Sequence, residues 1–571
     1  MKILTKNKFI WSIAILFLTV LFFYGGVLKT WFQADEWDWI GRYTYYNSIG
    51  PIPFWEAFES SLFPNPRYRF TPLFDGLFAL ETHFFGLYFT PYAIVSLAFH
   101  LCNGILVFLL VRKLTKNDKL GYLASFFFVT SSIGQKAVTW IFTSTNTQGA
   151  TLFSLIACIT FLNYLSKKKF KDIFLTFLFF FIALWFKETA IGLFLILPAI
   201  LIANNLNRKA RLDYKLILYI VAFGLFYSIL RYALSRIGAV IHTEGYPDFG
   251  RFLTIAEYIQ VIFWSPARAL VDNLVFPNTI YWLARILTMP FLSYLKLTPL
   301  TTTHDLFIEN QATNLVTLLI FIGIVIICIK SYKNISTNQL KTSFIFGIII
   351  IMSSALISLL LSIRGTSALN PIFRSRDMYF SVAGASICLA IILDIASKKF
   401  QKRNFLLFVV LIYGAYHFIN INQFVISKEQ QQAQPRRTII NKIYNTYPIL
   451  PKKTVFYVTS DSLYYGHSKP SLPYQTGFGR TLLVWYTLKN NTIPKKFMKD
   501  DYLFFPFSEG YKEIDNYGFG YFTDSNKLLA TLKDYHLTED SVFAFSYSGE
   551  KMQVTDITQQ TRTSLSKEIP K

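Results

Sequence analysis

Repeated apolar runs constrain this chain more than any other feature of its sequence. The first run, Phe9–Leu28, has no charged residue over about twenty positions, which is enough to cross a bilayer as a helix. Hydrophobic residues make up 53% of the 571 residues and charged residues 16%, more apolar surface than a soluble domain of this size needs. Further runs lie at Tyr92–Val111, Leu120–Ser132, Ala150–Leu165, Ile173–Phe186, Thr189–Ile202, Leu216–Leu234, Leu315–Ile329, Phe344–Ile363, Met378–Ile395 and Phe405–Ile421. We therefore expect a polytopic α-helical membrane protein with about eleven transmembrane helices.

Basic residues occupy every second loop between these runs. Because positively charged loops stay in the cytoplasm, this alternation predicts a multi-pass protein of the plasma membrane with a cytoplasmic N-terminus and an extracytoplasmic tail. The net charge of +23 then reflects topology and attraction to anionic membrane lipid, and no nucleic-acid partner is needed to explain it. The clusters are Lys2–Lys8, Arg112–Lys119, Lys167–Lys171, Arg208–Lys215, Lys330–Lys341 and Lys398–Arg403.

Two further apolar stretches, Phe252–Val271 and Ile280–Leu295, lie in a long outer loop. They are either interfacial helices or two additional spans, which would raise the number of transmembrane helices to about thirteen. Both alternatives leave the tail on the same side of the membrane.

The composition becomes polar at about residue 422, which predicts two domains, 1–421 in the membrane and 422–571 outside it. Gln430–Arg437 is typical of a linker, and the residues beyond it predict a small α/β domain in which we find no catalytic motif. The expected strands are Thr454–Thr459, Thr481–Leu488, Tyr502–Phe507 and Val542–Ser546, and the expected helix is Ser525–Tyr535.

An acidic motif, Asp35-Glu36-Trp37-Asp38, directly follows the first span. One carboxylate there could accept a proton from an attacking hydroxyl, and a second could orient that hydroxyl or hold a divalent metal ion. Simple solvation of a helix end is the alternative interpretation. The sequence contains no nucleotide-binding fingerprint, so no organic cofactor is predicted.

Cationic side chains at the predicted outer ends of spans form a second set of candidates. Arg374 and Arg376 lie on the outer side, where the positive-inside pattern disfavours arginine, and a guanidinium can bind phosphate with two hydrogen bonds. Their alternative role is to anchor the span. Lys187 and Glu188 form the tip of a tight hairpin, and a mutual structural ion pair is the alternative there. His100 and Asn103 share one helix face, which favours interhelical hydrogen bonds.

The order of short motifs resembles the GT-C superfamily of membrane glycosyltransferases, in particular its protein O-mannosyltransferase branch. The resemblance covers about residues 9–205, with weaker support at Arg374–Tyr379. The motifs are Asp35-Glu36-Trp37, Tyr68-Arg69-Phe70-Thr71-Pro72-Leu73, Phe85-Gly86-Leu87, His100-Leu101-Cys102-Asn103, Ala137-Val138-Thr139-Trp140 and Lys187-Glu188-Thr189-Ala190-Ile191.

This resemblance implies transfer of a sugar, with inversion, from a polyprenyl-phosphate donor to an extracytoplasmic acceptor. It makes Asp35 the catalytic base, with Glu36 as its alternate. It also implies that the substrate is bound by Arg69, Lys187, Glu188, Arg374, Arg376 and Tyr379. The chain departs from the pattern at Phe70, in lacking TPR repeats and in its tail, which leaves open whether the acceptor is a protein, a glycan or a lipid.

Two other classes of protein share some of these features. A polysaccharide polymerase or ligase of the O-antigen type also has many spans and outer arginines, but it does not need the acidic motif. A transporter would place charges at the bilayer midplane and break its helices within repeats, whereas the spans here are mostly uncharged.

Overall fold

A computed structural model describes residues 6–33, 35–62, 71–208, 213–238, 255–294, 303–362, 375–400, 403–464 and 469–568. The chain forms two compact units. The first contains residues 1–25, 61–74 and 95–424, and the second contains residues 26–60, 75–94 and 425–571.

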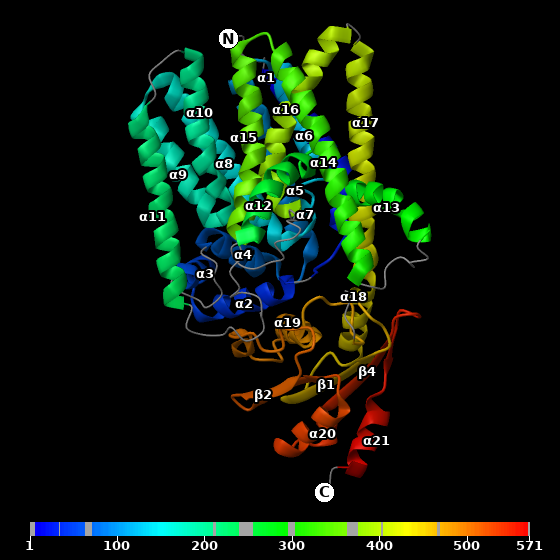
Figure 1. Ribbon diagram of the computed structural model, residues 1–571. Helices are drawn as coiled ribbons and strands as arrows, with labels where there is room; N and C mark the ends of the chain where they lie inside the picture. The colour runs from blue at the N-terminus through cyan, green and yellow to red at the C-terminus, as the bar shows by residue number, and fades with distance from the viewer. Residues whose placement is uncertain are drawn as a thin grey trace. The chain divides into compact units, whose positions relative to one another are not determined.

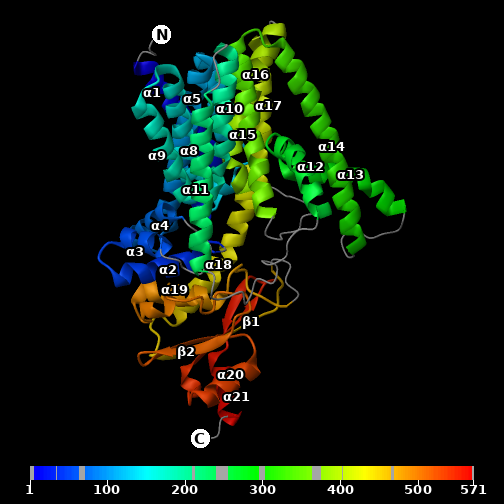
Figure 2. The ribbon, with the colours of Figure 1, turned by 60° about the vertical axis from the view of Figure 1, so that its left-hand side comes forward.

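The first unit is a bundle of long helices, among which α8 packs along α9 and α15 packs along α16 (Figures 1 and 2). Helix α16 also packs against α6, and α15 against α10 and α12. The unit contains, wholly or in part, α1 (Lys6–Tyr24), α5 (Phe89–Thr115), α6 (Asp118–Thr130), α7 (Lys136–Thr139), α8 (Ile141–Lys167), α9 (Phe170–Phe186), η2 (Glu188–Gly192), α10 (Leu193–Arg208), α11 (Tyr214–Gly238), α12 (Ile255–Asp272), α13 (Pro277–Tyr294), α14 (Thr303–Asn334), α15 (Asn338–Ser362), η3 (Ser375–Met378), α16 (Tyr379–Phe400) and α17 (Arg403–Ile421).

Each span expected from the sequence lies largely within a helix, although α8 and α14 begin nine and twelve residues earlier than expected. By length and composition, seven helices of the described part of the chain can cross a membrane. The two additional apolar stretches are the helices α12 and α13. The chain is thus a polytopic α-helical membrane protein with a small α/β region at its C-terminal end.

Two glycines let α15 and α16 approach closely. A Cβ atom on Gly384 would lie 2.4 Å from the carbonyl oxygen of Gly347, and one on Gly347 would lie 2.9 Å from the carbonyl oxygen of Gly384. Small residues at a crossing bring helix backbones together, which substitutes packing for the hydrophobic force that lipid does not supply. This crossing fixes the position of α16, which begins with the predicted site residue Tyr379 and directly follows η3, which carries Arg376.

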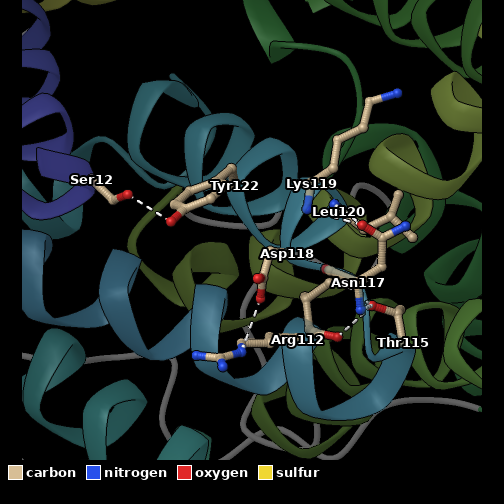
Figure 3. A network of polar contacts seen from close by, with 9 residues as sticks. Ser12, Arg112, Thr115, Asn117, Asp118, Lys119, Leu120 and Tyr122 are labelled. Atoms are coloured by element: carbon tan, nitrogen blue, oxygen red, sulfur yellow. Dashed lines mark hydrogen bonds and ion pairs between the residues drawn. The ribbon is translucent and has the colours of Figure 1, made fainter. Parts of the chain in front are cut away.

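The turn between α5 and α6 shows how a basic loop is held in place (Figure 3). Asn117 caps α6, because its side-chain oxygen accepts hydrogen bonds from the backbone N–H groups of Lys119 and Leu120 at 2.9 and 3.4 Å. Arg112 forms an ion pair of 2.9 Å with Asp118 across the same turn. One cation of this loop is therefore neutralised locally.

The second unit contains a mixed five-stranded sheet with the strand order β2-β3-β1-β4-β5. The central strand β1 is parallel to β3 and β4, whereas β2 and β5 are antiparallel to their neighbours. The elements of the unit, wholly or in part, are η1 (Gly25–Lys29), α2 (Glu36–Ile49), α3 (Pro53–Leu62), α4 (Pro72–Phe85), η4 (Asn422–Ile426), α18 (Ser427–Thr446), β1 (Lys453–Ser460), α19 (Phe478–Asn490), η5 (Lys495–Met498), β2 (Gly510–Ile514), β3 (Tyr517–Phe522), α20 (Ser525–Asp534), η6 (Glu539–Ser541), β4 (Val542–Ser548), β5 (Gln553–Asp556) and α21 (Thr558–Glu568).

Helices cover both faces of this sheet. Val455 of β1 belongs to a core shared with Leu528 of α20 and Leu565 of α21. The next residue, Phe456, points to the opposite face, where its ring lies 5.7 Å from that of Tyr486 on α19. Because successive side chains of a strand alternate between faces, β1 is buried on both sides.

Several expectations for the tail were wrong. Thr481–Leu488 is not a strand but lies within α19, and the expected linker Gln430–Arg437 lies within α18. Tyr502–Phe507 forms no strand, and the neighbouring hairpin is made by β2 and β3 instead. The strands at Thr454–Thr459 and Val542–Ser546 and the helix at Ser525–Tyr535 are confirmed as β1, β4 and α20.

Candidate active site

The short turn η3 and the start of α16 bring together predicted site residues from separate parts of the first unit. Lys187, between α9 and η2, forms an ion pair with Asp377 of η3, with 2.7 Å between Nζ and Oδ1. Lys187 Nζ also donates a hydrogen bond to Thr147 Oγ1 at 2.8 Å. The side chains of Lys187 and Asp377 are only 12% and 11% exposed, so the pair is largely shielded from solvent. The sequence suggested Glu188 as an alternative ion-pair partner of Lys187. In the structure, Lys187 forms its ion pair with Asp377.

Arg376 lies beside this pair on the same short turn. Its guanidinium carbon is 5.0 Å from the centre of the Trp140 ring, which is the geometry of a cation–π interaction. Trp140 precedes α8 directly, so the stacking fixes the arginine against the α7–α8 connection. A stacked guanidinium keeps its N–H donors in the plane of the group, where a phosphate can accept them.

Tyr379, the first residue of α16, is buried and connects to α5 and α8. Its hydroxyl lies 2.6 Å from Nδ1 of His100 and 3.4 Å from Oε1 of Gln148. The other ring nitrogen of His100 lies 3.1 Å from the Val129 carbonyl oxygen, and Asn103 donates to the carbonyl oxygen of Gln148 at 3.1 Å. The expected interhelical hydrogen bonds of His100 and Asn103 are therefore confirmed.

Thr147 and Gln148 were not among the residues proposed from the sequence. Both belong to Thr143–Gln148, a run of uncharged polar residues in the first two turns of α8. Gln148 also donates hydrogen bonds to Ser96 Oγ at 2.9 Å and to the Ala137 carbonyl oxygen at 2.7 Å. The signal that could have revealed them is this polar run at the start of an otherwise apolar helix.

The acidic motif lies in the second unit, at the start of α2. Asp35 is the N-cap residue and is half-buried, and its carbonyl oxygen accepts a hydrogen bond from the N–H of Trp39 at 3.1 Å, which closes the first turn. Glu36 is 1% exposed, and its carboxylate accepts a hydrogen bond from the N–H of Gln33. Of the two acids, Asp35 is thus the more accessible to a substrate.

Asp38, the third acid of the motif, is buried in an ion pair. Its carboxylate lies 3.2 Å from Nη2 of Arg480 on α19, and the two side chains are 1% and 0% exposed. Burial lowers the pKa of the Arg480 guanidinium, and the charge of Asp38 acts against that shift. Because an arginine stays protonated in proteins, the pair remains ionic. Trp37 is also buried, against Trp31 and Trp485.

The remaining predicted residues are placed less fully. Glu188 is half-buried at the first position of η2, next to Lys187. Arg69 and Arg374 lie outside the described residues. Among those that the structure describes, there is no group of three or more His, Cys, Asp and Glu side chains that could hold a metal ion.

Each of the two clusters has a distinct chemistry. The cluster around η3 contains a guanidinium and an ammonium group, which suit the oxygens of a phosphate, whereas the donors of Thr147 and Gln148 already form hydrogen bonds within the protein. The turn at α2 presents the accessible carboxylate of Asp35, which suits removal of a proton from a hydroxyl group.

The sequence and the structure were compared with known proteins. No curated protein matches the sequence. A crystal structure of ArnT from Cupriavidus metallidurans bound to undecaprenyl phosphate aligns with 99% of this chain and 96% of its own, at 11% identity and a TM-score of 0.38. Residues 70–232 match the model of the dolichyl-phosphate-mannose-protein mannosyltransferase family, a segment that includes Trp140, Thr147, Gln148 and Lys187. The resemblance to this family that the sequence motifs indicated is thereby confirmed over residues 70–232.

Proposed function

We propose that this protein is a membrane glycosyltransferase that moves a sugar from a polyprenyl-phosphate donor to an acceptor outside the cytoplasm, with inversion at the anomeric carbon. The observation that carries the proposal is the family match over residues 70–232, because this segment holds Lys187 and its partner Thr147. The polar cluster at the start of α16 adds a chemical reason, since it offers cations to a phosphate group.

In the proposed reaction, the acceptor oxygen attacks the anomeric carbon from the face opposite the phosphate. The carbon–oxygen bond to the phosphate breaks, and the electron pair stays on the leaving polyprenyl phosphate. Lys187 and Arg376 stabilise the negative charge that grows on this leaving group, which is how fixed cations accelerate a group transfer. Asp35 takes the proton of the attacking hydroxyl.

The sidedness of the reaction rests on the charge pattern and on the second unit. Residues 26–60 and 425–571 belong to one compact unit, which supports the expectation that the first loop and the tail share one side of the membrane. The basic clusters assign that side to the outside.

The test is a transfer assay with purified, full-length protein and a panel of polyprenyl-phosphate hexoses and pentoses. Cell-envelope material serves as the source of acceptors, and release of polyprenyl phosphate is measured. We expect release with at least one donor, and a product whose anomeric configuration is opposite to that of the donor. Release from polyprenyl-diphosphate oligosaccharides alone would instead identify a polymerase or ligase, and the proposal would be wrong.

A further inference from the structure

The C-terminal α/β region has no role in the reaction described so far, yet its helix α19 contacts the acidic motif. Arg480 of α19 is fully buried and lies 3.2 Å from the carboxylate of Asp38. The same guanidinium donates to the carbonyl oxygens of Met498 and Phe497 in η5, at 3.2 and 3.5 Å. One side chain therefore ties together α2, α19 and η5.

Other contacts hold α2 along its length. Arg42 forms an ion pair of 3.2 Å with Asp501, and the hydroxyl of Tyr43 donates a hydrogen bond to Asp75 at 2.5 Å. Gly41 sits so close to α19 that a Cβ atom there would lie 2.7 Å from a methyl carbon of Val484. Helix α2 is thus fixed in rotation as well as in position.

The segment before α2 is held by the tail in the same way. Gln430 of α18 donates to the carbonyl oxygen of Gly26 at 2.8 Å, and Arg437 donates to that of Thr30 at 2.6 Å. The chain that leads into the acidic motif is therefore fixed on both sides of Asp35.

A buried ion pair is a poor source of stability, because apolar residues of the same volume often do better. What a buried ion pair does specify is geometry, because the two charged groups must stay close to each other. Asp38 lies three positions after Asp35, within the turn that the Trp39 N–H closes onto the Asp35 carbonyl oxygen. Fixing Asp38 fixes this turn, and so it fixes the direction in which the Asp35 side chain leaves the backbone.

We propose that Arg480 is a positioning residue, which holds the Asp35 carboxylate in its proton-accepting orientation through the buried ion pair with Asp38. The C-terminal region is then part of the catalytic apparatus rather than an appendage for the acceptor. This inference rests on the proposed function, in which Asp35 is the base.

The experiment compares Arg480→Lys, Asp35→Asn and the double variant in full-length protein. Turnover is expressed per site that binds the polyprenyl-phosphate sugar, so that loss of folded protein does not count as loss of rate. We expect Arg480→Lys to lower kcat by about a hundredfold, because a small misplacement of a reacting group costs about that much. The KM for the donor should change less than about twofold, since donor binding is assigned to other residues.

The decisive result is the double variant. If Arg480 acts through Asp35, adding Arg480→Lys to Asp35→Asn should lower kcat no further, because residues that act as a unit are not additive. Arg562→Lys is the matched control. Arg562 also donates to backbone carbonyl oxygens and pairs with a carboxylate, but it lies on α21, which packs on β4 and η6. We expect this control to behave like the parent.

Asp38→Asn provides a second route to the same test, because it removes the ion pair and leaves the contacts of Arg480 with η5. The proposal is overturned if Arg480→Lys and Asp38→Asn keep the parental kcat, if their effects multiply with that of Asp35→Asn, or if both abolish donor binding. A parent protein that neither binds nor uses any polyprenyl-phosphate sugar is a different result, since it overturns the proposed function itself.

Discussion

Removing one charge of the buried pair between Lys187 and Asp377 should destabilise the protein strongly. The two charged atoms are 2.7 Å apart, and each side chain is little more than a tenth exposed. At an effective dielectric constant of about 20, Coulomb's law gives an attraction of about 6 kcal/mol at this separation. Desolvation offsets part of this, and losing one partner of a buried pair typically costs about 3–5 kcal/mol.

We therefore expect Asp377→Asn and Lys187→Met each to lower the free energy of unfolding by about 3 kcal/mol, the low end of that range because both side chains keep some exposure. The double variant should lose no more than either single variant, since it leaves no uncompensated charge. The coupling energy of the double-mutant cycle is then at least about 3 kcal/mol. Reversible unfolding of the purified protein in mixed micelles, followed by circular dichroism, measures it.

The matched control is a pair of the same residue types at the surface. Lys496 and Asp515 are even closer, at 2.6 Å, but their side chains are 66% and 62% exposed. Lys496→Met and Asp515→Asn should show a coupling energy too small to resolve, because solvent screens an exposed ion pair. A coupling energy that is equally small for Lys187 and Asp377 would refute the argument that burial makes this pair strong.

Three further predictions test other parts of the structure. Asp35→Asn should lower kcat by about 10²- to 10⁴-fold with donor binding retained, whereas Glu36→Gln should keep most of the activity, and equal losses would point to Glu36 as the base. Arg376→Lys keeps the charge but loses the planar fork that stacks on Trp140, so the Kd for the donor should rise about tenfold, as titration with the polyprenyl-phosphate sugar can measure. Gly384→Ala should lower the free energy of unfolding by about 1–3 kcal/mol, because its Cβ would meet backbone at 2.4 Å, and an unchanged value would mean that α15 and α16 can separate freely.

The spans could be predicted from the sequence because apolar runs of this length have few alternatives in a membrane protein. The tail was harder. Phe478–Thr487 is buried on every side, so α19 has no polar face, and an apolar run without periodicity fits a buried strand equally well. Helix α18 has the opposite problem, because its composition is too polar to indicate a packed helix. Its many glutamines and arginines are typical of a linker, although Ala433, Ile439 and Ile443 are buried.

The hairpin of β2 and β3 has a local signal in the sequence. Asp515 and Asn516 connect the two strands, and both have positive φ angles of 52° and 66°. Asp and Asn tolerate this conformation better than most residues, and two such residues in succession favour the tight turns that join antiparallel strands.

The site could be predicted only in pieces. Lys187, Arg376 and Tyr379 were proposed from motifs, and the structure brings all three to η3 and the start of α16. Their partners Asp377, Thr147 and Gln148 could not be chosen, because a single sequence does not say which helices cross at which depth. The buried role of Asp38 was equally hidden, since its partner Arg480 lies over four hundred residues away in the chain.

The discontinuity of the second unit has a consequence for how the protein is made. Helix α2 is among the first parts to leave the ribosome, whereas α19 and η5, against which it packs, are among the last. At about 5–20 residues per second, the wait between residues 60 and 425 is roughly 20–70 s. During that time Asp38 has no Arg480, and the apolar surface of Trp31 and Trp37 has no α19 to cover it. The nascent first loop is therefore a natural client for a chaperone or for the membrane surface.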